Sequence, residues 1–335
     1  MSPTRPVANT TPGHSKAAIW TALAIVYVVW GSTYLGIRIV SESLPPFAWG
    51  AMRFALAGVI IALIMAVRAW RSLRITWAQL GGCAVVGLLL LPGGNGLLAL
   101  SEAPQFGLPS GVAALVFAFN PLLTAVLRAV TGDRPRLLTL LGILVGLGGL
   151  AALFLPGTGG EVPLVGALLC LGSVTCWTIG SFATRWLAMP SDPFVATIYE
   201  LLIGSVALAA IAGRLGEPAP WLIPDVPAKA WLGLGYMVVF GSVIAFTAYI
   251  WLLHNAPISL VATYAYVNPV IALGLGALFA GEVITGQILI AALTVVAGVV
   301  LVVTVERPRS GALRSGAADG AVAAPASPVP PPPAQ

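Results

Sequence analysis

Charged residues are scarce in this chain. Only 8% of its 335 residues are Asp, Glu, Lys or Arg, whereas soluble domains contain roughly 25%. Hydrophobic residues make up 59% of the sequence, and the mean hydropathy is +0.98. The composition therefore excludes a soluble globular protein and indicates a chain that lies largely in a lipid bilayer.

The sequence also has few residues that carry enzyme chemistry. Its two histidines, His14 and His254, form no His-Glu-x-x-His zinc motif and no Ser–His pair within an apolar run. Its three cysteines, Cys83, Cys170 and Cys176, lie in apolar runs without a Cys-x-x-Cys pair, which is typical of packing residues. No aspartate lies in the middle of an apolar run, and the sequence has no glycine-rich ATP-binding loop. We therefore expect no enzyme activity, no cofactor, no metal site and no direct use of ATP.

What the sequence does have is long uncharged runs. A spanning helix needs about 20 apolar residues, and charged or Pro/Gly-containing breaks divide the chain into ten such segments. The runs lack the alternating polarity of transmembrane strands, so helices are expected. The predicted fold is an all-α polytopic membrane protein with ten transmembrane helices, at 17–38, 47–67, 77–98, 110–130, 137–155, 163–184, 194–213, 229–253, 258–280 and 284–304. Residues 1–16 and the Ala/Pro-rich residues 306–335 are predicted to be disordered tails.

Positive charge is distributed unequally between alternate loops. One side carries twelve Lys or Arg residues, and the other carries only Arg38, Arg214 and Lys229. The positive-inside rule therefore predicts that both termini are cytoplasmic. Because the charges lie between spans rather than on one soluble face, the net charge of +5 does not indicate nucleic-acid binding. Low Lys with high Arg, Gly and Ala usage favours a bacterial source, and hence the inner membrane.

The two halves of the sequence resemble each other. Trp30 and Trp177 each begin a Trp-x7-Arg pattern, 147 residues apart, and an Asn-Pro dipeptide at residue 120 recurs at residue 268. The shared order of these pairs predicts an internal duplication, with repeats at 17–155 and 163–304. Each repeat holds five spans, an odd number, so the second must insert upside down relative to the first. Inverted repeats are a signature of secondary transporters.

Several short motifs carry a family resemblance. In chain order they are Trp30-Gly-Ser-Thr-Tyr34, Leu44-Pro-Pro-Phe47 followed by Arg53-Phe-Ala-Leu-Ala-Gly58, Ser110-Gly-Val-Ala-Ala114, and Asn268-Pro269 followed by Gly281-Glu282. With these motifs the chain resembles EamA-type members of the drug/metabolite transporter superfamily. The resemblance implies an inverted 5+5 helix fold, a central substrate cavity with the fifth and tenth spans at the periphery, and export of amino acids or other small metabolites. Two departures from the family pattern are Gly132-Asp133 in place of Gly-Glu, and a segment Ser101–Pro109 that is longer than its counterpart Asn255–Pro257.

Two Asn-Pro pairs lie near the expected middle of the membrane. Asn120-Pro121 and Asn268-Pro269 are about eleven residues into helices of about 21. Proline lacks an N–H and clashes with the carbonyl four residues before it, so each pair predicts a helix break. The asparagine amides can line a substrate cavity, or the pairs can act only as packing kinks, and the sequence favours neither interpretation.

A further break is predicted inside the third span. Pro92-Gly-Gly-Asn95-Gly96 places an amide beside flexible backbone, where a substrate or a neighbouring helix can approach closely. Close helix packing is the simpler interpretation for the glycines, whereas Asn95 is a candidate site residue.

Two ionisable residues lie inside expected spans. Arg53 and Glu200 are each six residues from the start of their span and are 147 residues apart. A charge at that depth costs a few kcal/mol unless it is paired or hydrated, so both side chains should face the interior. Arg53 can bind a substrate carboxylate, and Glu200 can take up a proton or bind a substrate ammonium group. Alternatively, each is an anchored polar residue near a cavity mouth.

Aromatic and hydroxyl side chains complete the expected cavity wall. The candidates are Trp30, Thr33 and Tyr34 of the first span, Trp177 and Ser181 of the sixth, Tyr199 of the seventh and Tyr264 of the ninth. Tyr and Trp also form belts at membrane interfaces, but Trp30 and Trp177 lie deeper than a belt requires.

Together these features predict a secondary transporter that exports a small metabolite, such as an amino acid or a drug, by alternating access. Its expected partners are the lipid bilayer and a small-molecule substrate, with protons as the candidate coupling ion. Two alternatives stay open on the sequence alone. A passive channel-like facilitator would show neither saturation nor exchange stimulation, and a lipid-handling protein would show turnover without solute movement.

Overall fold

The computed structural model describes residues 16–132, 136–153 and 162–305, and only the backbone of residues 258 and 259. All of these residues belong to one compact unit. The expected tails lie outside the described residues, except for Lys16, which is the first residue of a helix and not the last of a disordered segment. Asp133 and the expected end of the fifth span, at residues 154–155, also lie outside them.

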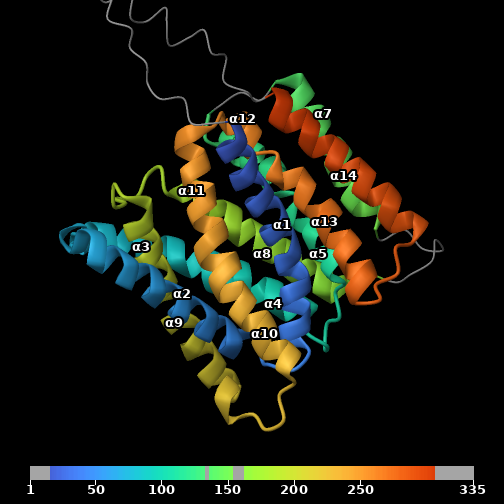
Figure 1. Cartoon of the computed structure of the whole chain (residues 1–335). Coiled ribbons are helices and arrows are strands. Elements are labelled where there is room, and N and C mark those ends of the chain that lie inside the picture. The colour runs from blue at the N-terminus through green and yellow to red at the C-terminus, as the bar shows by residue number, and fades with distance from the viewer. Residues whose placement is uncertain (1–15, 133–135, 154–161, 306–335) are drawn as a thin grey trace, which may run out of the picture. The chain divides into compact units, whose positions relative to one another are not determined.

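The described residues form ten helical segments at the positions of the ten predicted spans. Figure 1 shows how they are arranged. Six consist of one helix: α1 (Lys16–Ser41), α2 (Pro46–Ala69), α7 (Leu137–Ala152), α8 (Leu164–Ala183), α9 (Pro193–Leu215) and α14 (Gly286–Val305). The other four are composite. They are α3 (Trp77–Leu88) with η2 (Leu89–Gly96) and α4 (Leu97–Glu102); α5 (Ser110–Phe117) with α6 (Asn120–Val130); α10 (Ala228–Tyr236) with η4 (Met237–Ile244) and α11 (Ala245–Asn255); and α12 (Ile258–Val261) with α13 (Tyr264–Phe279). The short 3-10 turns η1 (Trp70–Leu73) and η3 (Pro220–Leu222) lie in connections.

The spans are apolar on their outer surface as well as in the core. Eight of the described segments are long and apolar enough to cross a membrane, and Leu137–Ala152 and Tyr264–Phe279 are shorter apolar helices. Large hydrophobic side chains such as Leu144, Val206 and Leu293 are exposed on the outside. Helices satisfy their own backbone hydrogen bonds, so they can present such a surface to lipid. The described residues contain no strand.

The third and eighth spans each contain a π-helical segment, η2 and η4, and the two segments begin 148 residues apart. The predicted interruption at Pro92 therefore does not take the form of a broken helix. Instead the helix widens, and the backbone N–H of Leu97 reaches the carbonyl of Pro92, five residues before it. A π turn tolerates the missing N–H of proline within a continuous helix. Its repeat counterpart η4 contains no proline, so no sequence motif indicates it.

The two Asn-Pro pairs differ in their effect on the helix. In the fourth span, Ala118 and Phe119 separate α5 from α6 directly before Asn120 and Pro121. In the ninth span the interruption at residues 262–263 lies six residues before Pro269, and α13 continues through this proline. The helix break predicted at the second pair is thus displaced toward the start of the span.

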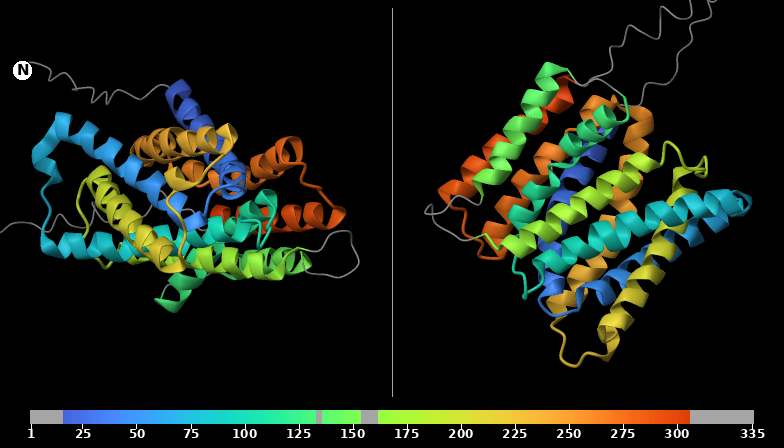
Figure 2. Two further views of the ribbon diagram at one scale, coloured as in Figure 1. Left: turned by 90° about the horizontal axis from the view of Figure 1, so that it is seen from below. Right: turned by 180° about the vertical axis from the view of Figure 1, so that it is seen from behind.

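The fifth and tenth spans lie together at one edge of the bundle. In Figure 1 and in the right view of Figure 2, α7 runs beside α14, and α2 runs beside α9 at the opposite side. The contact between α7 and α14 depends on Gly142 and Gly298, because a Cβ atom at residue 298 would lie only 2.6 Å from the Gly142 carbonyl oxygen. The candidate site residues all lie on spans other than α7 and α14, with Arg53 on α2 and Tyr199 and Glu200 on α9.

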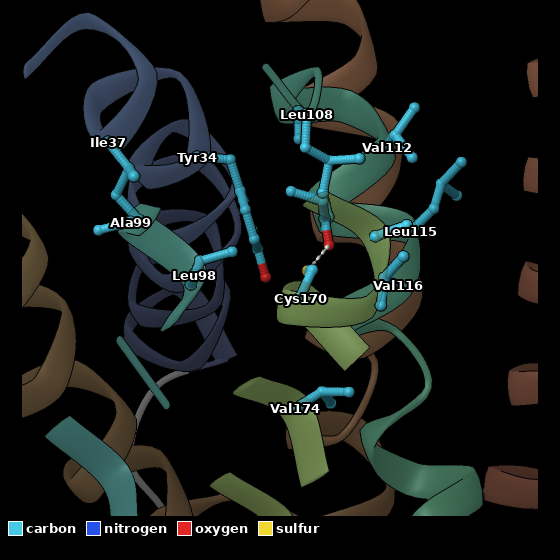
Figure 3. Packing of buried hydrophobic residues seen from close by; sticks show 14 of the residues in the cluster. Tyr34, Ile37, Leu98, Ala99, Leu108, Val112, Leu115, Val116, Cys170 and Val174 are labelled. Carbon is cyan, nitrogen blue, oxygen red and sulfur yellow. Dashed lines mark hydrogen bonds between the residues drawn. The ribbon is translucent and has the colours of Figure 1, made fainter. Parts of the chain in front are cut away.

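The bundle has two loop ends. The proximal end is where α1 begins, and it includes residues 70–76, 184–192 and 256–257. The distal end is where α1 ends, and it includes residues 42–45, 103–109, 216–227 and 280–285. A hydrophobic cluster of α1, α4, α5 and α8 lies toward the distal end, and Figure 3 shows Tyr34 of α1 pointing between α4 and α8 within it.

Candidate substrate-binding site

Two groups of aromatic rings meet α1 one helical turn apart, and we call them together the aromatic chain. Trp30 contacts Tyr249 and Tyr264, with ring centroids 5.0 and 5.3 Å apart. One helical turn further along α1, Tyr34 contacts Phe117 at 6.2 Å, and Phe117 contacts Trp177 at 5.9 Å. Trp30 and Tyr34 share a face of α1 because they are four residues apart. Helix α1 therefore joins the rings of α11 and α13 to the rings of α5 and α8.

Trp30 also links α1 to the π-helical segment η4. Its Nε1–H donates to the carbonyl oxygen of Gly241 at 3.2 Å, which satisfies the indole in a half-buried position. Thr33 donates its hydroxyl hydrogen to the Trp30 carbonyl at 2.6 Å. The methyl group of Thr33 also faces Gly241, so these two candidate residues both lie against η4.

The three candidate asparagines are held by local hydrogen bonds. Asn120 Oδ1 accepts from the Thr178 hydroxyl at 3.1 Å, which joins α6 to α8. Asn95 Nδ2 donates to the Leu90 carbonyl at 3.2 Å within η2. Asn268 is buried, and in the amide orientation that satisfies its surroundings its nitrogen donates to the carbonyl oxygens of residues 27 and 264, each at 3.3 Å. Each amide therefore supports the non-regular backbone near the aromatic chain.

Arg53 is a buried cation without a carboxylate partner among the described residues. Only 6% of the residue is exposed, and the guanidinium lies over the Phe54 ring at 4.8 Å. Its Nε donates to the Ser242 hydroxyl at 3.1 Å, and Nη1 contacts the sulfur of Met237 at 3.6 Å. Both partners are in η4, the segment that also receives the Trp30 indole. A guanidinium has five N–H donors, so this arrangement leaves donors available for an anion.

Glu200 occupies the equivalent place in the second half. Its backbone lies against Gly87 at the end of α3, where a Cβ atom on the glycine would come within 2.7 Å of the Glu200 carbonyl oxygen. No hydrogen bond or ion pair to its half-buried carboxylate occurs within the part of the chain that the structure describes. The structure does not bring Arg53 and Glu200 together as an ion pair.

Two candidate residues do not join the aromatic chain. The Tyr199 hydroxyl donates to the carbonyl of Leu73 at 2.6 Å, so this side chain ties α9 to the turn η1 at the proximal end. Ser181 is exposed near the end of α8. Both residues lie on spans that carry other candidates, but the sequence alone does not give the direction in which their side chains point.

Four residues of this region are not among the candidates predicted from the sequence. Phe117 and Tyr249 complete the aromatic chain, Ser242 binds Arg53, and Glu102 is a buried carboxyl at the end of α4. Only Glu102 carries a signal in the sequence, because it is a charged residue directly after an apolar run.

The distal end is held by carboxylates at helix starts. Glu217 accepts a hydrogen bond from the backbone N–H of Ala48 at 2.8 Å, at the start of α2. Burial raises the pKa of Glu217 above its usual value, although backbone hydrogen bonds from Ala48 and Phe47 oppose the shift. Glu282 accepts from the backbone N–H groups of Ser110 at 2.6 Å and Gly111 at 3.0 Å, at the start of α5. A carboxylate at a helix N-terminus is stabilised by the helix dipole.

The model of the EamA-like transporter family matches residues 16–155 and again residues 164–304. The chain belongs to this family. The uncharacterised inner membrane transporter YedA of Escherichia coli is 35% identical over 286 residues, which are 85% of this chain and 90% of YedA. The uncharacterised transporter YvbV of Bacillus subtilis is 24% identical over 87% of this chain and 93% of its own length.

A solved crystal structure has the same fold as this EamA-family chain. The two superpose with a TM-score of 0.60 at 23% sequence identity, over 87% of this chain and 98% of the other. Membership of the family establishes a multi-pass membrane protein that acts as a transporter of small molecules.

Proposed function

We propose that this EamA-family protein exports a small carboxylate-bearing metabolite, such as an amino acid, across the bacterial inner membrane by alternating access. The observation that carries the proposal is Arg53, a buried guanidinium whose described partners are a hydroxyl, a sulfur and an aromatic ring. A buried charge is costly unless an anion or hydrogen-bonding groups compensate it. A substrate carboxylate supplies that anion and can bind the planar guanidinium with two parallel hydrogen bonds.

The surroundings of Arg53 support a small substrate with an apolar part. The segment η4 that binds Arg53 also accepts the Trp30 indole N–H, so the guanidinium and the aromatic chain share one supporting element. Aromatic rings provide apolar area for a side chain, while a few fixed polar groups set the orientation of the ligand. Glu200, which has no described partner for its carboxylate, is the candidate group for the ammonium of a zwitterion.

The repeat architecture supports the transport mechanism. In transporters built from inverted repeats, substrate sites lie near the midplane at irregular segments, and access alternates as one part moves against the other. Here the π-helical segments η2 and η4 are the irregular parts related by the repeat. With both termini placed in the cytoplasm, the proximal end faces the cytoplasm and the distal end faces outward.

Arg53 variants in liposomes test the proposal. The purified full chain is reconstituted, and counterflow of radiolabelled amino acids is competed with each amino acid or with its uncharged amide. Wild-type protein should prefer the acid. Arg53→Gln should lose this preference, with a rise in KM of tenfold to roughly a hundredfold, because a hydrogen bond to a charged group contributes about 1.5–3 kcal/mol. The exposed distal variant Arg214→Gln is the control and should retain the preference.

An unchanged acid-to-amide ratio in Arg53→Gln would overturn the role of Arg53. Solute movement without saturation or counterflow would support the channel-like facilitator instead. Lipid movement without solute transport would support the lipid-handling alternative.

A further inference from the structure

Glu102 is the most completely buried carboxyl group of the described chain. It is the last residue of α4, in the third span, and only 1% of it is exposed. Neither Oε1 nor Oε2 has a hydrogen-bond partner among the residues that the structure describes. Buried polar groups nearly always have partners, so two unpartnered carboxyl oxygens at one site require an explanation.

The segment 103–109 directly follows Glu102 and is the connection that exceeds its counterpart in the other repeat. The Leu108 N–H donates to the carbonyl of Ser101 at 3.0 Å, which folds the segment back onto the end of α4. Arg38 of α1 donates to the Leu108 carbonyl at 3.2 Å. Gly166 of α8 also lies against this segment, close to the Phe106 carbonyl. The segment that follows Glu102 is therefore held against α4, α1 and α8 at the distal end.

Five segments pack against α4, namely α1, α2, η2, α5 and α8. The ionisable groups near Glu102 are Tyr34 and Arg38 from α1, Cys170 from α8, and Glu282 from the α13–α14 loop. Helix α2 supplies no ionisable group to this site, because its buried Arg53 binds Ser242 and Met237. The described parts of η2 and α5 contain no ionisable side chain.

The hydrogen bonds and ion pairs of these neighbouring groups show whether any of them donates a hydrogen bond to Glu102. The Glu282 carboxylate already accepts two backbone N–H bonds at the start of α5. The Arg38 guanidinium donates to the Leu108 carbonyl and lies 3.9 Å from the Glu42 carboxylate. No donor is thus directed at Glu102, while a second carboxylate lies nearby.

An ionised Glu102 without donors would cost several kcal/mol in such surroundings. A bound metal cation would need about six oxygen ligands, and the described surroundings offer no group of three or more acidic or other metal-binding side chains. The neutral carboxylic acid is the form that this site can hold.

We propose that Glu102 is a proton-binding site of the distal gate: it must be protonated before segment 103–109 closes over it, and it releases the proton to water on the distal side when the segment opens. The proton leaves as a hydrated proton, and the carboxylate remains in contact with water. Closing of the distal end is then coupled to uptake of one proton from that side. At the offset of 148 residues that relates η2 to η4, the equivalent position is Ile250, so the second repeat carries no matching group.

This proposal rests on the transporter function for its consequence, a dependence of transport on the pH of the distal side, but the binding site itself can be tested without transport. The first experiment records infrared spectra of the full chain reconstituted in vesicles without substrate, between pH 5 and pH 9. A protonated carboxyl in an apolar site gives a separate C=O band. That band should persist in wild-type protein well above the pH at which an exposed glutamate ionises, and Glu102→Gln should remove it. Glu42→Gln, which alters an exposed carboxylate paired with Lys229 at 2.7 Å, is the control and should leave the band unchanged.

A second measurement separates the role of Glu102 from that of Glu200. A hydrophobic carbodiimide attaches to protonated carboxyl groups, and mass spectrometry of the labelled chain locates the modified residue. Labelling of Glu102 at neutral pH supports the proposal. If both the band and the label are absent from protein that circular dichroism shows to be folded, the proposal is overturned. It is also overturned if transport requires sodium in place of protons.

Transport then tests the coupling. Wild-type counterflow should slow as the pH on the distal side is raised while the pH on the proximal side is held constant, and Glu102→Gln should lose this dependence. The same dependence on distal pH in Glu102→Gln would contradict the coupling. If wild-type protein shows the infrared band but moves no solute, the proton site stands and the proposed transport function fails.

Discussion

The carboxylate of Glu282 holds the start of α5 by accepting a hydrogen bond from the Ser110 backbone N–H at 2.6 Å. The two residues are 172 positions apart and belong to different repeats, so the contact joins the two halves at the distal end. The preceding residue, Gly281, has φ of 65°, a left-handed conformation that favours glycine and turns the carboxylate toward α5. Gly216 and Glu217 repeat this arrangement at the start of α2.

Removal of the Glu282 carboxylate should destabilise the protein. Glu282→Ala leaves two N–H groups at the start of α5 without an acceptor, and hydrogen bonds to a charged group contribute about 1.5–3 kcal/mol each. We expect a lower midpoint of thermal unfolding in detergent. Glu42→Ala is the matched control, since an exposed ion pair contributes less than about 1 kcal/mol. Equal midpoints for the two variants would contradict a structural role for the Glu282 contact.

The α7–α14 contact predicts a difference between two glycine substitutions. Gly298→Val would place side-chain atoms against the backbone of Gly142 and Gly146, so it should cost about 1–3 kcal/mol or more. Gly148→Val on α7 meets no atom within 4 Å and should have little effect on packing. Thermal unfolding of both variants measures the difference. If Gly298→Val is as stable as Gly148→Val, the result contradicts the close approach of α7 and α14.

Glu217 predicts a pH dependence of stability at the distal end. Its pKa is raised by burial, so the folded protein binds this proton more tightly than the unfolded chain does. Its contribution to the free energy of unfolding is therefore present at low pH and is lost as pH rises from about 4.3, the usual glutamate pKa, through the raised value. Glu217→Gln should flatten the stability profile in that window, as measured by denaturant unfolding at several pH values. An identical slope in the variant would contradict this assignment.

The distribution of positive charge predicts the orientation of the chain. A fluorescent protein that folds only in the cytoplasm should be bright when fused to the C-terminus of the full chain. A phosphatase that is active only outside the cytoplasm should be active when inserted after Glu217, within the distal loop of residues 216–227. The opposite pattern would reverse the orientation and, with it, the direction proposed for proton uptake at Glu102.

The number and order of the spans could be predicted from the sequence because lipid imposes a simple requirement. Each span must be long, apolar and helical, and runs such as residues 286–305 satisfy this without reference to any partner. The inverted arrangement followed from an odd number of spans per repeat. The family motifs added the relative positions of the spans, with the fifth and tenth at one edge.

The site could be predicted only in part, because side-chain direction depends on tertiary contacts. Trp30 contacts Tyr264, and Tyr34 and Trp177 both contact Phe117. Tyr199 instead turns to the carbonyl of Leu73 at the proximal end. The segment η4 has no proline, and nothing in its composition distinguishes a π turn from an α-helix. Glu102 follows an apolar run like many loop residues, and its burial results from tertiary packing that the sequence does not show.

The most direct test of the account is efflux from liposomes that contain the purified full chain. Radiolabelled amino acids and nucleobases are loaded inside, and efflux is measured with and without unlabelled solute outside and with and without a pH gradient. Saturable efflux of a carboxylate-bearing solute that is accelerated by external unlabelled solute is the predicted result. Efflux that neither saturates nor responds to exchange, or no efflux of any carboxylate from folded protein, would contradict it.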